Sequence, residues 1–263
     1  MVAVSLKNIT AERSPKFRVS DFSAEIETGD LIGVIGPNGS GKSTLAKAIV
    51  GTQAISAGEI AFGNRPAQSL TPVERAKMVG YLPQHAHFAW DMPVREAVEL
   101  GAFARRGETS QPGKLDETLQ NCDLSDLENR NVLSLSGGEQ MRVHIARVIY
   151  GNHEVIVADE PCASLDIEHQ HRTMQLLQQH ARVRSSLVII HDLNLAQIYC
   201  DRLLLLHEGR LQTDGRPEQV LTSGHCRAAF GVTFKRFAEA DAQNQTRSLL
   251  VAEPNLRLHD EGD

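Results

Sequence analysis

A glycine-rich turn at residues 36–44 carries the chemistry that this sequence most plainly supports. It reads GPNGSGKST, follows the apolar run Leu31–Ile35 and opens a stretch with helical periodicity. Glycines let backbone N–H groups approach an anion closely, and the positive end of the following helix dipole points to the same place. In this motif Lys42 reaches the β- and γ-phosphates of a nucleotide, and the Ser43 hydroxyl binds Mg²⁺. We therefore predict a phosphate-binding loop (P-loop) formed by Gly36, Pro37, Asn38, Gly39, Ser40, Gly41, Lys42, Ser43 and Thr44.

Two adjacent carboxylates supply groups suited to phosphoryl transfer. Asp159 and Glu160 follow the apolar run Val155–Ala158, and open α/β sheets bind ligands at the carboxyl ends of their strands. Asp159 is placed to hold Mg²⁺ through water, and Glu160 to polarise the water that attacks the γ-phosphate. Without the P-loop, a solvated acidic turn after a strand would explain the pair equally well. With it, the catalytic interpretation is favoured.

A second anion-binding pattern lies at Leu135–Glu139, which reads LSGGE. The Ser136 hydroxyl, the N–H groups of Gly137 and Gly138 and the start of the following helix can together form a nest for an anion. Because the P-loop already surrounds the phosphates of one nucleotide, the second nest indicates that it faces another nucleotide.

These motifs, in this order, resemble the ATP-binding subunit of ATP-binding-cassette (ABC) transporters from about residue 3 to residue 235. The resemblance implies an ATPase that uses ATP and Mg²⁺, in which two copies of the chain sandwich two ATP molecules. It also implies that the signature residues close on the γ-phosphate held by the partner's P-loop. In this chain the signature residues are Ser136, Gly137, Gly138 and Glu139.

Four more positions take roles implied by the resemblance. Gln84 matches the Q-loop glutamine, which contacts Mg²⁺ or the attacking water, and His191 matches the switch histidine, which hydrogen-bonds the γ-phosphate. Asp166, in Ser164–Asp166, matches the D-loop that crosses the dimer interface. Phe17 is the candidate for stacking on adenine, with an ordinary strand residue as the alternative. The expected catalytic residues are thus Glu160, His191 and Gln84, and the expected metal-binding residues are Ser43, Gln84 and Asp159.

Details of the motifs narrow the resemblance to bacterial importers. Residues 191–196 (HDLNLA), 81–84 (YLPQ), 94–96 (VRE) and 215–217 (GRP) are similar to the group that serves iron(III)-siderophore, haem and cobalamin uptake, and zinc and manganese importers share part of the pattern. The resemblance implies partnership with integral-membrane permease subunits and, indirectly, with a substrate-binding protein. It places the chain on the cytoplasmic face of the inner membrane. The alternatives are a soluble ABC-type ATPase, such as one in iron–sulfur assembly, and a small-nucleotide kinase or GTPase.

Composition limits these alternatives. The chain has 263 residues, 41% of them hydrophobic and 23% charged, with a net charge of −6; this is a globular mix that argues against a nucleic-acid surface. No apolar stretch approaches the ~20 residues that span a bilayer, and the N-terminus lacks the pattern of a signal peptide. We therefore expect a cytoplasmic protein without nucleic-acid partners.

The periodicity of the sequence predicts an α/β fold. Alternation at Val2–Leu6 and Phe22–Ile26 predicts an N-terminal antiparallel β subdomain, and the short apolar runs at 155–158, 187–190 and 203–206 predict buried parallel strands with helices on both faces. With the P-loop these strands form a RecA-like P-loop NTPase core, expected over residues 1–84 and 136–235. We expect a helical subdomain over residues 85–135, in which Trp90 lies either on a permease-docking surface or in the core, and an extension over 236–263.

Overall fold

The central sheet of the computed structural model has six strands in the order β10-β9-β3-β8-β7-β6. The structure describes residues 1–14, 17–105, 113–240 and 246–253. Neighbouring strands are parallel except at the edge, where β10 is antiparallel to β9. The predicted buried parallel strands are therefore confirmed. The strands are β3 (Leu31–Ile35), β6 (Val79–Leu82), β7 (Val155–Asp159), β8 (Ser185–Ile189), β9 (Arg202–His207) and β10 (Arg210–Gly215).

Alternate residues of each central strand face two separate hydrophobic layers. Ile32 and Val34 of β3 belong to a layer with the N-terminal sheet and helix α1 (Lys42–Val50). Leu31 and Ile35 belong to a layer with the helices on the other face. Since both faces of the sheet are covered, its strands consist of nearly continuous apolar residues.

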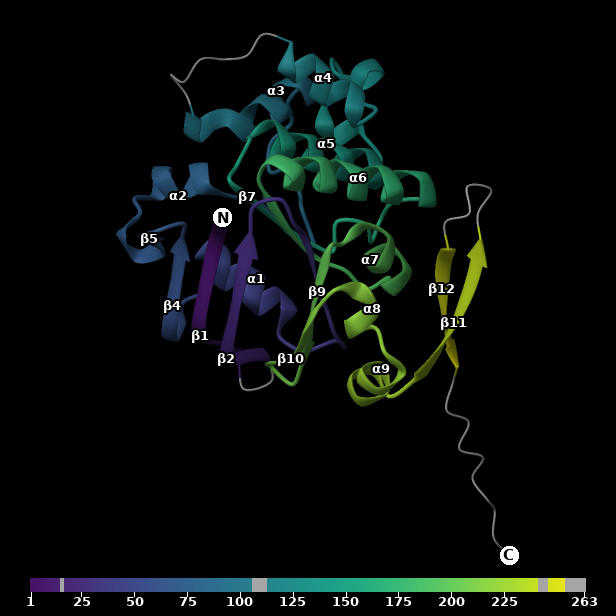
Figure 1. Cartoon of the computed structure of the whole chain (residues 1–263). Coiled ribbons are helices and arrows are strands. Elements are labelled where there is room, and N and C mark those ends of the chain that lie inside the picture. The colour runs from purple at the N-terminus through teal and green to yellow at the C-terminus, as the bar shows by residue number, and fades with distance from the viewer. Residues whose placement is uncertain (15–16, 106–112, 241–245, 254–263) are drawn as a thin grey trace, which may run out of the picture.

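A second, antiparallel sheet in the order β2-β1-β4-β5 lies beside the central one, at the left of Figure 1. Alternate residues such as Val4, Leu6 and Phe22 are fully buried against α1 and the central sheet. This confirms the predicted N-terminal antiparallel strands. The strands are β1 (Val2–Ser14), β2 (Phe17–Glu27), β4 (Ile55–Phe62) and β5 (Arg65–Pro66).

Short helices occupy residues 67–135 around β6. At the start of α2 (Pro72–Met78), Thr71 and Glu74 form a reciprocal capping box. The other elements are η1 (Ala67–Ser69), α3 (Val94–Glu99), η2 (Leu100–Arg105), α4 (Lys114–Asn121), η3 (Ser125–Leu127) and η4 (Val132–Ser134). Elements α3 and α4 pack on α5 (Gly137–Tyr150) at the top of Figure 1. Residues 106–112, part of the helical subdomain expected over residues 85–135, lie outside the described residues. Trp90 is 74% exposed, so a core tryptophan is excluded.

The C-terminal part contains α6 (Ile167–Val183) and α7 (Leu193–Tyr199), the helices expected between the buried parallel strands, followed by α8 (Pro217–Val220). The sequence interpretation did not include α9 (Ser223–Phe230) or a separate hairpin of β11 (Thr233–Ala240) and β12 (Thr246–Glu253). The hairpin stands at the right edge of Figure 1, where Leu250 is buried and its backbone is hydrogen-bonded to Asn194 of α7. The expected boundary at residue 235 falls inside β11; the hairpin, a single unit, begins at Thr233.

Helices in the described parts of the chain are all too short or too polar to cross a bilayer.

Candidate functional site

Four adjacent strands deliver the predicted site residues to one edge of the central sheet. In the order β3-β8-β7-β6, the P-loop follows β3, His191 follows β8, Asp159 and Glu160 end β7, and Gln84 follows β6. Because the strands are parallel, their carboxyl ends meet at the same edge. Residues far apart in the sequence therefore converge over the P-loop.

The P-loop depends on glycine where the chain turns. Gly36, Gly39 and Gly41 have φ of 149°, 82° and 103°, values that glycine adopts without the cost a side chain imposes. A Cβ atom at Gly36 would lie 2.1 Å from the carbonyl oxygen of Leu206, and one at Gly41 would lie 2.6 Å from that of Arg18. The loop is thus held closely against neighbouring backbone.

Several groups of the loop have free capacity for an anion. Gly41 at the N-terminus of α1 provides no side-chain cap for the N–H groups of the first turn. The Ser40 hydroxyl is buried without a hydrogen-bond partner among the described residues. Lys42 is 6% exposed, and its Nζ donates to the carbonyl oxygens of Gly36 (2.8 Å) and Pro37 (3.0 Å). Burial lowers the pKa of Lys42, while the charges of Glu160 and Asp159 oppose this. A bound phosphate would satisfy all these groups.

Ser43 and Asp159 form the part of the site suited to Mg²⁺. The Ser43 hydroxyl donates to Asp159 Oδ1 at 3.2 Å. Burial raises the pKa of Asp159, which is 2% exposed, and the hydrogen bond from Ser43 lowers it. Two hard oxygen donors at this position fit a cation that accepts a few protein ligands and keeps several waters.

Tyr81 on β6 is a neighbour of this pair that the sequence analysis did not single out. Burial and the nearby charge of Asp159 raise the pKa of Tyr81 to about 12. The sequence could have indicated this position, because a tyrosine within a buried strand needs a polar neighbour for its hydroxyl group.

Glu160 is held from both sides by the two other predicted catalytic residues. Gln84 Nε2 donates to Glu160 Oε2 at 2.7 Å, and His191 Nε2 lies 2.6 Å from Oε1. The Glu160 backbone has φ of 54° in the left-handed region, and its N–H donates to the carbonyl oxygen of Ile189. The strained turn and the two side-chain contacts fix the carboxylate at the mouth of the P-loop.

The resulting depression above the P-loop is open and polar. It encloses about 640 Å³ together with its solvent-filled mouth, and Asn38, Lys42, Ser43, Gln84 and Glu160 are among its lining residues. Lys47 of α1 also lines it, a position missed from the sequence. Within the described part of the chain no signature residue contributes to this lining.

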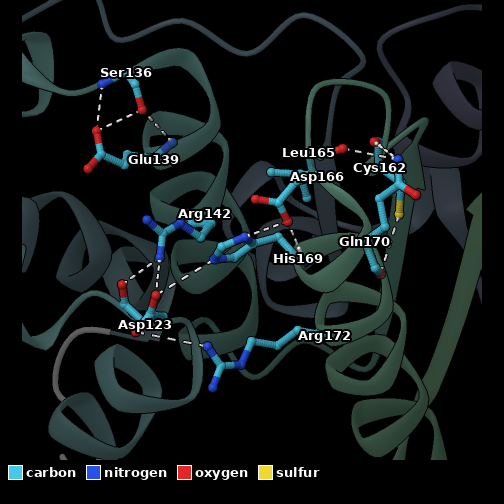
Figure 2. Close-up of polar contacts among 10 residues, drawn as sticks. All are labelled: Asp123, Ser136, Glu139, Arg142, Cys162, Leu165, Asp166, His169, Gln170 and Arg172. Atoms are coloured by element: carbon cyan, nitrogen blue, oxygen red, sulfur yellow. Dashed lines mark hydrogen bonds and ion pairs between the residues drawn. The ribbon is translucent and has the colours of Figure 1, made fainter.

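The signature residues occupy a separate place at the N-terminus of α5. Ser136 is the N-cap: its hydroxyl accepts from the Glu139 N–H (3.4 Å), and Glu139 Oε2 accepts from the Ser136 N–H and hydroxyl (both 2.7 Å). Figure 2 shows this capping box at its upper left. These bonds from Ser136 lower the pKa of Glu139. Above Gly137 a Cβ atom would meet no other atom within 4 Å, so this helix end is open to an external ligand.

Asp166 and Phe17 complete the predicted set. Asp166 is the N-cap of α6, accepting from the His169 N–H at 2.9 Å. Phe17 is the first residue of β2, but its side chain lies outside the described residues, so adenine stacking by Phe17 stays a prediction.

Comparison with known proteins identifies the family. The sequence profile described as "ABC transporter" matches residues 19–163, more than half of the chain. The chain belongs to the ABC transporter family. As an ABC ATP-binding protein it binds ATP and is an ATPase, so the predicted nucleotide and the predicted enzyme activity are both confirmed.

Two curated relatives carry importer names. The hemin import ATP-binding protein HmuV of Pseudomonas aeruginosa is 39% identical over 234 residues, which cover 86% of this ABC protein and 92% of the relative. The cobalamin import ATP-binding protein BtuD of Halobacterium salinarum is 36% identical over 217 residues, 81% of this chain and 54% of the relative. The predicted resemblance to the haem and cobalamin group is therefore confirmed.

Solved structures agree with the ABC fold. An ATP-binding cassette determined as a dimer in a post-hydrolysis state, bound to ADP and Pi, matches with a TM-score of 0.71 and 28% identity over 81% of this chain and 98% of that one. The predicted P-loop NTPase fold is confirmed.

Proposed function

We propose that this chain powers the import of a haem-, cobalamin- or iron(III)-siderophore-type ligand through a membrane permease. Support comes from the HmuV and BtuD relatives, which are named for hemin and cobalamin import, and from the sequence motifs shared with that group. The protein would act on the cytoplasmic face of the membrane, bound peripherally to permease subunits. A substrate-binding protein would be an indirect partner, acting through the permease.

The ATPase site of this proposal is composite. Two copies sandwich two ATP molecules, each between the P-loop of one chain and Ser136–Glu139 of the other. The observation that supports this arrangement is the open, ligand-ready N-terminus of α5, separate from a P-loop that has its own carboxylates. The dimeric state of the similar ATP-binding cassette is consistent with it.

Within one half of the site, Ser43 would hold Mg²⁺ directly and Asp159 through water, with Gln84 available as a further oxygen ligand. Mg²⁺ bound there neutralises charge on the phosphate oxygens during phosphoryl transfer. Lys42 would exchange its two backbone carbonyl acceptors for phosphate oxygens, since a charged donor gains more from a charged acceptor.

Glu160 would act as the general base for the attacking water. Its two carboxylate oxygens accept from Gln84 and His191. When the γ-phosphate arrives, His191 Nε2–H can donate to it, and Gln84 can donate to the water, so that Glu160 is released to accept a proton. The contacts at 2.6 and 2.7 Å therefore hold the base within reach of the water that would attack the γ-phosphate.

Trp90 is proposed to transmit the ATPase cycle to the permease. It lies in the connection between Gln84 and α3 and is 74% exposed, and exposed tryptophan is enriched at protein interfaces. Phe103 and Leu133, 58% and 52% exposed, add apolar surface in the same helical part.

The decisive experiment is purification of the Glu160→Gln chain with Mg-ATP from native membranes. Co-purification of a stoichiometric polytopic permease, followed by ATPase stimulation of the wild-type complex by its binding protein loaded with haem, cobalamin or a ferric siderophore, would establish the importer and its ligand. Recovery of a soluble partner from cytosol instead would favour the non-transport ABC ATPase.

A further inference from the structure

A polar cluster outside the P-loop joins the signature helix to the D-loop helix. Figure 2 shows its members on three elements: Asp123 in the loop after α4, Arg142 in the second turn of α5, and His169 in the first turn of α6. The P-loop chemistry does not use these residues. Ser136 and Asp166 are the N-cap residues of α5 and α6, and they belong to the two motifs that face the partner chain in the proposed sandwich.

Asp123 is the common acceptor of the cluster. Arg142 Nη1 donates to Asp123 Oδ2 at 2.7 Å and to its backbone carbonyl oxygen at 2.6 Å. Asp123 has φ of 55°, a left-handed conformation that Asp tolerates better than most residues. The arginine therefore holds both the charge and the backbone of the residue that turns the chain away from α4.

The α6 side of the cluster faces the same carboxylate. His169 Nδ1 lies 2.8 Å from Asp166 Oδ1, while its Nε2 is 3.7 Å from Asp123 Oδ2 and has no closer polar partner among the described residues. Arg172 Nη1, about one turn further along α6, is 3.9 Å from Asp123 Oδ1. The histidine ring thus lies between the D-loop aspartate and the loop aspartate.

Beneath the cluster the helices pack closely. A hollow of only about 10 Å³, no larger than one water molecule, is lined by Cys122, Arg142, Ile145, His169, Arg172 and Leu176, together with Thr173. The charged contacts through Asp123 therefore lie at the edge of a nearly filled contact between α5 and α6 and add to it.

We propose that Asp123, Arg142 and His169 form a latch that sets the position of the signature relative to the D-loop. They are positioning residues, since none of them contacts the P-loop pocket. The inference rests on the proposed ATP sandwich, in which the signature and the D-loop, at the starts of the two helices that the latch joins, face the partner chain. Loosening the latch would therefore weaken dimer closure on ATP and leave ATP binding by a single P-loop intact.

The test uses the full-length Glu160→Gln chain with a second substitution. Asp123→Asn removes the charge and keeps a residue that tolerates positive φ; Asp116→Asn is the matched control, because it breaks the exposed Arg95–Asp116 pair (2.7 Å) within the helical part. We expect Asp123→Asn to raise the ATP concentration for half-maximal dimerisation about tenfold, as for loss of one coupled charge pair. ATP affinity of the monomer and the far-UV circular dichroism spectrum should stay unchanged, and Asp116→Asn should match the parent.

Hydrogen exchange of the nucleotide-free chain gives a readout that does not need dimerisation. Asp123→Asn and Arg142→Gln should each speed exchange in the first turn of α6, and the double variant should add little to either. Equal exchange and equal dimerisation for Asp123→Asn and Asp116→Asn would overturn the latch, as would faster exchange without any change in dimerisation. Should the Glu160→Gln parent stay monomeric at saturating Mg-ATP, the sandwich would fail, whereas the exchange comparison would still decide whether the latch exists.

Discussion

Replacing Gly36 by alanine tests how tightly the P-loop is held against the rest of the core. The new Cβ would lie 2.1 Å from the Leu206 carbonyl oxygen and 2.8 Å from Ser40 Oγ, at a φ of 149°. Backbone strain of this kind costs about 1–3 kcal/mol, and overpacking against an immobile carbonyl costs about 1–3 kcal/mol more. The neighbouring backbone must therefore move, and the loop with it.

The matched control is Gly63→Ala. Gly63 also has positive φ (56°), but a Cβ there meets no atom within 4 Å, so this variant carries the strain and not the clash. For a chain of this size, ~1 kcal/mol shifts Tm by about 2–4 °C, so calorimetry should find Gly36→Ala melting about 2–12 °C below Gly63→Ala. ATP affinity should fall only in Gly36→Ala. Equal melting temperatures and equal ATP affinities would refute the close approach to Leu206.

Three further results are expected. Burial raises the pKa of Asp159, so the folded chain binds the proton of this carboxyl group more tightly than the unfolded chain does. The protein therefore loses stability as pH rises from 3.8 through the raised pKa. We expect Asp159→Asn to melt at a higher temperature than wild type at pH 7 and to lose Mg-ATP hydrolysis; a lower Tm would contradict this. Burial lowers the pKa of His144 to about 4, and neither ring nitrogen has a hydrogen-bond partner among the described residues. The contribution of neutral His144 to stability is complete above pH 6.5 and is lost as pH falls toward 4. The free energy of unfolding of His144→Phe, measured with urea, should therefore depend less on pH in this range than that of wild type. Trp90→Ala should leave basal ATPase activity unchanged but reduce permease binding or permease stimulation, and full stimulation of the variant would exclude its docking role.

The sequence predicted the P-loop and the strand that carries the acidic pair best, because the same local residues there determine both the backbone conformation and the chemistry. The P-loop glycines and the apolar strand before Asp159 are local signals, since each acts through its own backbone or its near neighbours. The carboxyl ends of parallel strands then brought Gln84, Glu160 and His191 together as expected.

Other features depend on contacts between distant segments that no local pattern contains. The hairpin of β11 and β12 is stabilised partly by Asn194, which lies 56 residues before Leu250 in the chain. The link from Arg142 to Asp123 needs the loop after α4 to reach α5, and the exposure of Trp90 depends on which helices surround it. Such features follow from tertiary packing.

The most direct test of the composite site is the mass of the Glu160→Gln chain in solution with Mg-ATP. Light scattering should show a change from the 28.9 kDa monomer to twice that mass when Mg-ATP is added. Adding Ser136→Arg should abolish the dimer while ATP binding persists, because the signature of one chain must contact the nucleotide of the other. A chain that stays monomeric at saturating Mg-ATP, or a dimer that is indifferent to Ser136→Arg, would contradict a site shared between two copies.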